Sequence, residues 1–158
     1  MFDYSQEWLC RRIVEESRDA VIFADGQGVI RLWNLGAQEM FGYTVAEALG
    51  QSLDLIIPET LRGRHHEGYR RVMATGATRY AQDLLAVPGL RKDGARLSLE
   101  FTIVLVRADD GEILGTAALI RDVTARWQKD KALRARLAAL EARTAGGTPQ
   151  PAGPASET

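Results

Sequence analysis

The two histidines of this chain stand side by side in the stretch ETLRGRHHEGYRRVMATG, which runs from Glu59 to Gly76. An imidazole can exchange a proton, hold a hydrogen bond or bind a metal ion near neutral pH. Neighbouring side chains on a helix point about 100° apart, so His65 and His66 cannot face the same surroundings. The chemistry available to this segment therefore depends on which histidine faces inward.

Helical periodicity selects His65 as the inward residue. The stripe at spacing i, i+4, i+7, i+8 and i+11 consists of Leu61, His65, Gly68, Tyr69 and Val72. His66 shares its side of the helix with Arg62 and Arg70, so we expect it to face solvent. Gly68 would leave free volume about one turn beyond His65, as a flat ligand requires. An inward imidazole is either a hydrogen-bonded core residue or a metal ligand, and periodicity alone leaves both open.

Few other residues indicate chemistry. No nucleophile, base and acid appear in the pattern of a catalytic set, and no glycine-rich loop between a strand and a helix is placed to bind phosphate. Cys10 is the only cysteine, which excludes an internal disulfide and a multi-cysteine metal site. We therefore do not expect an enzyme.

The composition excludes several further classes of protein. The 158 residues suit a single domain, and 46% hydrophobic with 26% charged residues is ordinary for a globular protein. The net charge of −1 gives no reason to expect a nucleic-acid partner. No apolar run approaches the roughly 20 residues of a membrane span, and the N-terminus lacks the pattern of a signal peptide. We therefore expect a cytoplasmic protein without a membrane partner.

Helices are expected at both ends of the chain. Residues 1–18 have an amphipathic pattern, and residues 124–143 are rich in the strong helix formers Ala, Leu, Lys and Arg. The apolar residues at helical spacing are Trp8, Leu9 and Ile13 in the first and Leu133, Leu137 and Leu140 in the second. Residues 144–158 have the composition of a disordered tail.

Residues 19–123 are predicted to form one α+β domain. Two short apolar runs, 19–25 and 28–34, predict a hairpin, and short helical patterns then lead to a helix that starts at Pro58. A strand that ends near Pro88 is followed by two more across consecutive turns, which predicts an antiparallel meander. One sheet with these helices on one face would enclose a pocket beneath the longest helix.

The same residues carry a family resemblance. The stretches DAVIFADGQGVIRLWNLGAQEMFGYTVAEALGQSLDLIIPE, RKDGARLSLEFTIVLV and GTAALIRDVTARW resemble a PAS domain over roughly residues 19 to 127. Its typical features here are Trp33-Asn34, Phe41-Gly42-Tyr43, Lys92-Asp93-Gly94 and Arg121-Asp122-Val123-Thr124. The resemblance implies a five-stranded antiparallel sheet with helices on one face and a ligand cavity between the sheet and the long helix. It also implies a sensor that signals through its flanking helices.

Within that family, the segment from Leu61 to Gly94 is similar to that of the rhizobial oxygen-sensing haem kinases. An ungapped alignment places His65, not His66, on the axial haem ligand. The resemblance therefore implies haem b with its iron bound by His65, Tyr69 on the same stripe, and a diatomic gas (O2, CO or NO) or a redox change as the signal. Arg71 and Arg79 align with basic side chains near the haem propionates. Any enzymatic turnover would be incidental peroxidase-like haem chemistry.

The distal side departs from those sensors, which use an arginine to hydrogen-bond bound oxygen. The residues expected to form the distal wall here are Leu85, in the place of that arginine, with Phe101, Ile103 and Leu119. An apolar wall stabilises oxygen poorly and tolerates carbon monoxide or nitric oxide better. Tyr80 or Gln82 is a candidate hydrogen-bond donor whose position the sequence does not fix.

Two alternatives remain open from the sequence. One is a PAS domain that binds a flavin such as FAD for redox sensing. The light-sensing kind is excluded, because it needs a cysteine inside the domain and Cys10 precedes it. The other alternative is a ligand-free dimerisation module. In each case we expect a free-standing homodimer, associated through the N-terminal helix and also the C-terminal one, that signals to a separate downstream protein.

Overall fold

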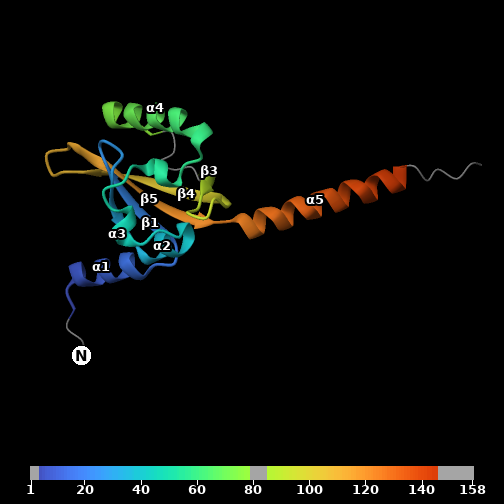
Figure 1. Ribbon diagram of the computed structural model, residues 1–158, viewed down its shortest axis with the longest axis horizontal. Coiled ribbons are helices and arrows are strands. Elements are labelled where there is room, and N and C mark those ends of the chain that lie inside the picture. Colours follow the sequence, from blue (N-terminus) through green and yellow to red (C-terminus); the bar gives the residue numbers. More distant parts are fainter. Residues whose placement is uncertain (1–3, 79–84, 146–158) are drawn as a thin grey trace, which may run out of the picture. The chain divides into compact units, whose positions relative to one another are not determined.

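The computed structural model describes residues 4–78 and 85–145, and its centre is a five-stranded antiparallel sheet with helices on one face. The strands lie in the order β2-β1-β5-β4-β3 (Figure 1). The elements are α1 (Gln6–Glu16), β1 (Ala20–Asp25), β2 (Ile30–Trp33), α2 (Leu35–Phe41), α3 (Val45–Ala48), η1 (Leu53–Ile56), α4 (Glu59–Thr75), β3 (Leu85–Leu90), β4 (Arg96–Arg107), β5 (Ile113–Asp122) and α5 (Thr124–Ala145). The α+β architecture expected from the sequence is confirmed.

Local turn chemistry forms the hairpin predicted near the N-terminus. The Asp25 carboxylate at the end of β1 accepts hydrogen bonds from the amides of Gln27 and Val29, each at 3.0 Å. Gly28 between them has φ of 79°, a conformation that favours glycine. The predicted meander of β3, β4 and β5 is also present, and β1 pairs with the free side of β5. The two ends of the domain thus meet in one sheet.

Strand β3 continues further than the sequence indicated. It was expected to end near Pro88, but it runs to Leu90, with Pro88 paired to Ser98. β3 is an edge strand, and an edge strand tolerates a residue that has no N–H to donate. The first part of the expected strand falls in residues 79–84, outside the described ranges.

The core lies between the sheet and the short helices. On β4, Leu97 and Leu99 are buried, whereas Thr102 on the other face is exposed. Phe41 of α2 is fully buried, and its ring centroid lies 5.6 Å from that of Trp33 at the end of β2. This alternation along β4 is the two-residue period of a strand with one buried face.

Helix α4 is the longest helix of the sheet-containing unit, yet none of its residues is fully buried. It follows Pro58 and ends at Gly76, whose φ of 63° closes the helix in the left-handed conformation. Two glycines inside it, Gly63 and Gly68, have no atom within 4 Å of the place that a Cβ would occupy. Apolar packing therefore holds α4 less firmly than it holds α2.

Asn34 joins α1, β1 and α2. Its side chain is buried, and its oxygen accepts from the amides of Val21 at 2.8 Å and Ala37 at 2.9 Å. Its amide nitrogen donates to the carbonyls of Val14, Ser17 and Asp19 at 2.9, 3.2 and 3.0 Å. One side chain thus caps α2, binds β1 and fixes the chain that leaves α1.

The chain divides into two compact units, the first ending at Thr124 and the second comprising residues 125–158. In the described part of the second unit, α5 extends to Ala145, two residues beyond the expected end at 143, and buries no residue. The disordered tail predicted from residue 144 lies, from residue 146 onward, outside the described chain. Among the helices that the structure describes, none has the length and apolar character that crossing a bilayer requires.

We predict that Asn34→Ala lowers the free energy of unfolding by about 3 kcal/mol, because it removes a helix cap and leaves buried backbone groups without partners. Urea denaturation of the purified protein measures this change. Leu35→Ala, at the exposed neighbouring position, is the control, with a loss of at most about 1 kcal/mol expected. An equal loss in the two variants would contradict the role assigned to Asn34.

Candidate functional site

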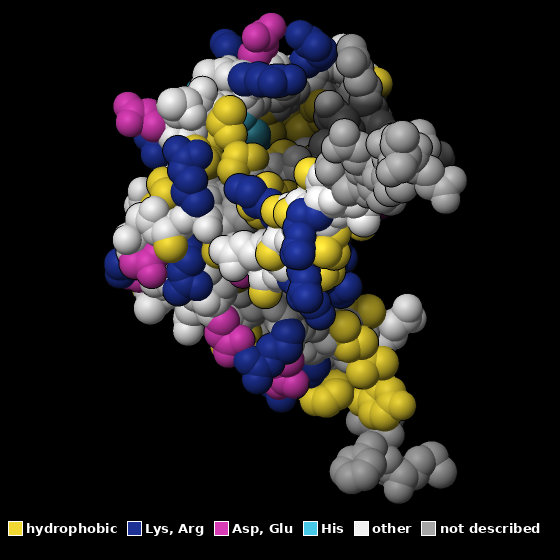
Figure 2. Space-filling model, turned by 90° about the vertical axis from the view of Figure 1, so that its right-hand side faces the viewer, with side chains coloured by type: hydrophobic (Ala, Val, Ile, Leu, Met, Phe, Trp, Pro, Cys, Tyr) yellow, Lys and Arg dark blue, Asp and Glu magenta, His cyan; other side chains and the backbone are white. Residues whose placement is uncertain are grey.

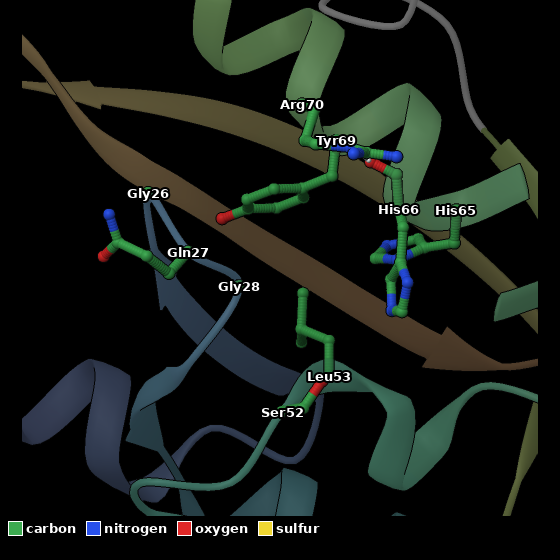
Figure 3. A pocket seen from close by; sticks show the side chains of 9 residues that line it. All are labelled: Gly26, Gln27, Gly28, Ser52, Leu53, His65, His66, Tyr69 and Arg70. Atoms are coloured by element: carbon green, nitrogen blue, oxygen red, sulfur yellow. Dashed lines mark hydrogen bonds between the residues drawn. The ribbon is translucent and has the colours of Figure 1, made fainter. Parts of the chain in front are cut away.

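A cavity of about 510 Å³ opens between α4, the β1–β2 turn and the start of η1. Its volume is in the range of small-molecule sites. The residues that line it are Gly26, Gln27, Gly28, Ser52, Leu53, His65, His66, Tyr69 and Arg70 (Figure 3). Figure 2 shows a histidine recessed among hydrophobic side chains. The four side chains from α4 make this helix the main chemical wall of the cavity.

His65 is half-buried against the cavity, as the helical pattern predicted. Its ring centroid lies 5.8 Å from that of Tyr69. Its Nδ1 is buried and has no hydrogen-bond partner among the described residues. Burial lowers the pKa of His65, the neighbouring His66 lowers it further, and Asp54 acts in the opposite direction. The imidazole is therefore neutral at neutral pH, which is the form that binds a metal ion.

His66 is exposed, as expected, but it also lines the cavity and has a partner that the sequence did not reveal. Its Nε2 lies 2.6 Å from Oδ1 of Asp54, in η1. Metal-binding imidazoles commonly donate their second N–H to a carboxylate. The pair therefore makes His66 the rival of His65 as a metal ligand, although one of its ring nitrogens is already engaged.

Tyr69 ties α4 to the sheet. Its hydroxyl lies 2.6 Å from the carbonyl oxygen of Asp25 and 3.0 Å from that of Ala24, and so donates at the end of β1. The Thr116 hydroxyl of β5 donates to the hydroxyl oxygen of Tyr69 at 3.4 Å. Burial raises the pKa of the Tyr69 phenol, so the proton needed for these bonds is retained.

Several residues predicted for the site do not reach this cavity. Arg71 lies outside the lining and pairs with Glu67 at 3.3 Å on the exposed surface of α4. Gly68 is also exposed, so it does not supply the free volume that the sequence suggested. Phe101 and Ile103 are half-buried on the inner face of β4 but are absent from the lining.

Leu119 is a correction to the predicted distal wall. It pairs with Val21 and Thr102, whereas its neighbours Ala118 and Ile120 pair with Ile103 and Phe101. The residues opposite one another in paired strands share a face. Leu119 therefore points to the outer face of the sheet, where it is 44% exposed, and the prediction that it joins Phe101 and Ile103 is wrong.

The remaining predicted residues lie partly or wholly outside the part of the chain that the structure describes. The backbone of Leu85 pairs with Phe101, so the two stand directly opposite, but the Leu85 side chain is outside the described part. Arg79, Tyr80 and Gln82 also fall outside it. The proposed distal donors and one of the two arginines for the propionates therefore stay predictions.

Sequence reasoning found only His65 and Tyr69 among the nine residues that line the cavity, and it also missed Asp54, the partner of His66. Arg70 had been placed on the side of His66, and this spacing of four residues was the available signal that the two share a wall. Asp54 gave no such signal, because its bond to His66 joins two separate helical elements across the Pro58 turn.

The fold and the cavity define a class of protein: a single-sheet α+β module with a ligand-sized site under one helix. The family described as the PAS fold matches residues 14–128, and the chain belongs to that family. Among solved structures, the PAS domain of a protein from Colwellia psychrerythraea superposes with a TM-score of 0.65 and 20% identity, over 74% of this chain and 96% of that one. The predicted PAS architecture is confirmed.

Two curated relatives are named as sensors. The chain is 30% identical over 130 residues to the sensor protein FixL of Bradyrhizobium diazoefficiens, covering 82% of this chain and 25% of FixL. It is 23% identical over 128 residues to the oxygen sensor protein DosP of Escherichia coli, covering 81% of this chain and 16% of DosP. The chain therefore spans a quarter or less of the length of these relatives, and the predicted resemblance to the rhizobial sensors is confirmed.

We predict that Tyr69→Phe lowers the free energy of unfolding by about 1 kcal/mol and speeds amide hydrogen exchange in α4, because the hydroxyl bonds to β1 are lost. Denaturant titration and hydrogen exchange measure the two effects. Tyr43→Phe, a half-buried tyrosine outside the cavity, is the matched control. If exchange in α4 were equally fast in both variants, Tyr69 would not be the tie between helix and sheet.

Proposed function

We propose that this chain is a sensory PAS module that binds haem b through His65 and responds to a diatomic gas or to a redox change. The observation that carries the proposal is the position of His65 in the cavity wall, with a half-buried imidazole whose Nδ1 has no partner among the described residues. A buried polar atom without a partner is costly unless a ligand or water satisfies the group. An imidazole held neutral in a cavity of this size suits an axial haem ligand.

The relatives add support of a different kind. DosP is named an oxygen sensor and FixL a sensor protein. Two sequence arguments favour His65: the helical pattern, and the resemblance of the α4 segment to rhizobial haem sensors. No catalytic role is part of the proposal, because PAS domains generally serve as sensory modules.

In this proposal, haem supplies an iron that can bind a gas or change its redox state. The chain supplies the surroundings. His65 would hold the iron from α4, and Tyr69, one turn further on, links the same helix to β1 and to Thr116 of β5. A displacement of α4 at His65 would therefore reach two central strands through one side chain. Transmission to a downstream protein through the flanking helices is part of the proposal.

The choice of gas is proposed from sequence. Leu85 aligns with the position at which the rhizobial oxygen-sensing haem kinases have an arginine, so a charged donor is absent at that position. We infer that oxygen gains less from this site than it does from an arginine-containing one, whereas carbon monoxide and nitric oxide depend less on such a donor.

Assembly as a homodimer is also proposed. Trp8, Leu9 and Ile13 of α1 are 46%, 37% and 61% exposed. On α5, Leu133, Leu137 and Leu140 are exposed as well. Apolar stripes of this kind on a helix are typical of surfaces that a partner covers. A second copy of the chain would cover the stripe of α1, and that of α5 in addition.

We predict that multi-angle light scattering at micromolar concentration finds a dimer and that Ile13→Glu shifts it toward monomer, because a charge in an apolar contact is costly. Arg11→Glu, two residues before Ile13 and on the opposite side of α1 from it, changes the charge and leaves the dimer intact. A monomer in the unmodified protein would remove the dimer from the proposal.

We predict that the purified protein shows a haem Soret band, that His65→Ala abolishes stoichiometric haem binding, and that His66→Ala largely retains it. The physical reason is that the His65 imidazole is half-buried in the cavity wall and held neutral by burial, whereas His66 is exposed. Visible spectra recorded during haem titration measure both variants, and added imidazole should restore an axial ligand in His65→Ala.

The opposite pattern, with the chromophore lost in His66→Ala and kept in His65→Ala, would show that both the helical facing and the alignment are wrong. A flavin spectrum in the unmodified protein, or no visible absorption even after haem titration, would instead favour the flavin-binding or the ligand-free alternative.

A further inference from the structure

Helix α5 carries an apolar stripe that no described residue covers. Its members Leu133, Leu137 and Leu140, which we call the leucine stripe, are 55%, 57% and 49% exposed, and the helix buries none of its 22 residues. The spacing of four and then three residues is that of the core positions in a two-stranded coiled coil. Because most of the stability of a helix in a protein comes from packing of its apolar face, the leucine stripe favours a partner helix.

The two edges of α5 that flank the leucine stripe differ in charge. Lys129, Arg136 and Arg143, spaced seven residues apart, make one edge entirely basic. The other edge contains Arg134 and Glu141, which are also seven apart. Arg136 and Glu141 are five residues apart and so lie on opposite edges, beyond the reach of a pair on one helix. In the part of the chain that the structure describes, neither makes an ion pair, so both charges are available to a second helix.

These charges distinguish the two directions in which identical helices could pair. In an antiparallel pair each edge faces the same edge of the other helix, so the basic edge would face a second basic edge. In a parallel pair each edge faces the opposite one, and a residue meets the one five positions further on in the other helix. Arg136 would then meet Glu141 of the second copy, and a two-fold symmetric pair would contain this contact twice. The charges therefore favour the parallel direction.

Polar residues limit the length of the contact. The positions seven residues before and after Leu137 hold Asp130 and Thr144, so the leucine layers do not continue past them. Lys129 would meet Arg134 of the second copy, a repulsion that Asp130, four residues before Arg134 on its own helix, partly offsets. Association costs at least about 4 kcal/mol before any contact is counted. Three leucine layers therefore depend on a further dimer contact, which raises the effective concentration of one helix at the other.

We propose that α5 pairs with α5 of a second copy of the chain, parallel and in register through Leu133, Leu137 and Leu140, with Arg136 of each copy against Glu141 of the other. This rests on the proposed homodimer and not on haem binding. It adds the direction and the register of the contact, and it places the C-terminal ends of the two helices side by side. A downstream protein would thus meet two identical helix ends as one surface.

Disulfide cross-linking of the full chain tests the direction. The exposed Cys10 is first replaced by Ser, and Leu133→Cys, Leu140→Cys or Ala135→Cys is then added. Identical residues of the leucine stripe face each other in a parallel pair, so Leu133→Cys and Leu140→Cys should each form a covalent dimer alone under mild oxidation. Ala135→Cys, on the surface away from the stripe, is the matched control and should stay monomeric on a non-reducing gel.

A charge exchange tests the register. In the Leu140→Cys protein, Arg136→Glu would place like charges together and should lower the yield of covalent dimer about threefold or more. Adding Glu141→Arg to Arg136→Glu restores opposite charges and should restore the yield. Lys131→Glu makes the same change of charge on the far side of α5 and should leave the yield unchanged.

The contrary results separate the possibilities. A covalent dimer formed only when Leu133→Cys and Leu140→Cys are mixed would show an antiparallel pair. An equal yield from Ala135→Cys would show unspecific collision, and a charge exchange that restores nothing would show that the register is wrong. Absence of cross-links in a protein that light scattering finds dimeric would overturn the pairing of α5 and leave the dimer, with another surface or a different protein as the cover of the leucine stripe. A monomer in the unmodified protein would remove the dimer and this inference together.

Discussion

The cavity exists because α4 is held above the sheet by polar contacts at separate points and not by a buried apolar face. None of its residues is fully buried. Tyr69 bonds to the end of β1, His66 bonds to Asp54 in η1, and Arg107 of β4 donates to the carbonyl oxygen of Gly76 at 3.2 Å. A helix packed through leucines would close on the sheet and exclude a ligand. The polar supports keep the helix in place and leave the space beneath it open.

The opposite side of the domain is built in another way. Around Asn34, one buried side chain satisfies two amides and three carbonyls, and Trp33 and Phe41 pack beside it. A fully satisfied buried network specifies one arrangement and penalises departures from it. The domain thus combines a rigid corner with a less firmly held helix, and a sensor needs both: a fixed reference and an element that a ligand can move.

Regular patterns predicted the fold, and local spacing predicted only the part of the site that lies on one helix. The apolar runs 19–25 and 28–34 and the consecutive turns after Pro88 were sufficient for the strands, because those signals are local. His65 and Tyr69 were found from helical periodicity. Leu119 was assigned to the wrong face of the sheet. The pairing register between β5 and its neighbours decides which face a strand residue occupies, and the sequence alone does not determine that register. Asp54 was missed because its contact with His66 joins separate elements.

The two glycines of α4 give the helix a thermodynamic character of its own. Gly63 and Gly68 stand in open space, so nothing near them requires the absence of a side chain. Each weakens a helix interior by roughly 0.5–1 kcal/mol relative to alanine. Local unfolding of α4 is correspondingly cheap compared with unfolding of the whole domain. A bulky ligand could then enter without a permanent opening, because local unfolding of α4 would admit it. Binding would in turn stabilise the folded form of the helix.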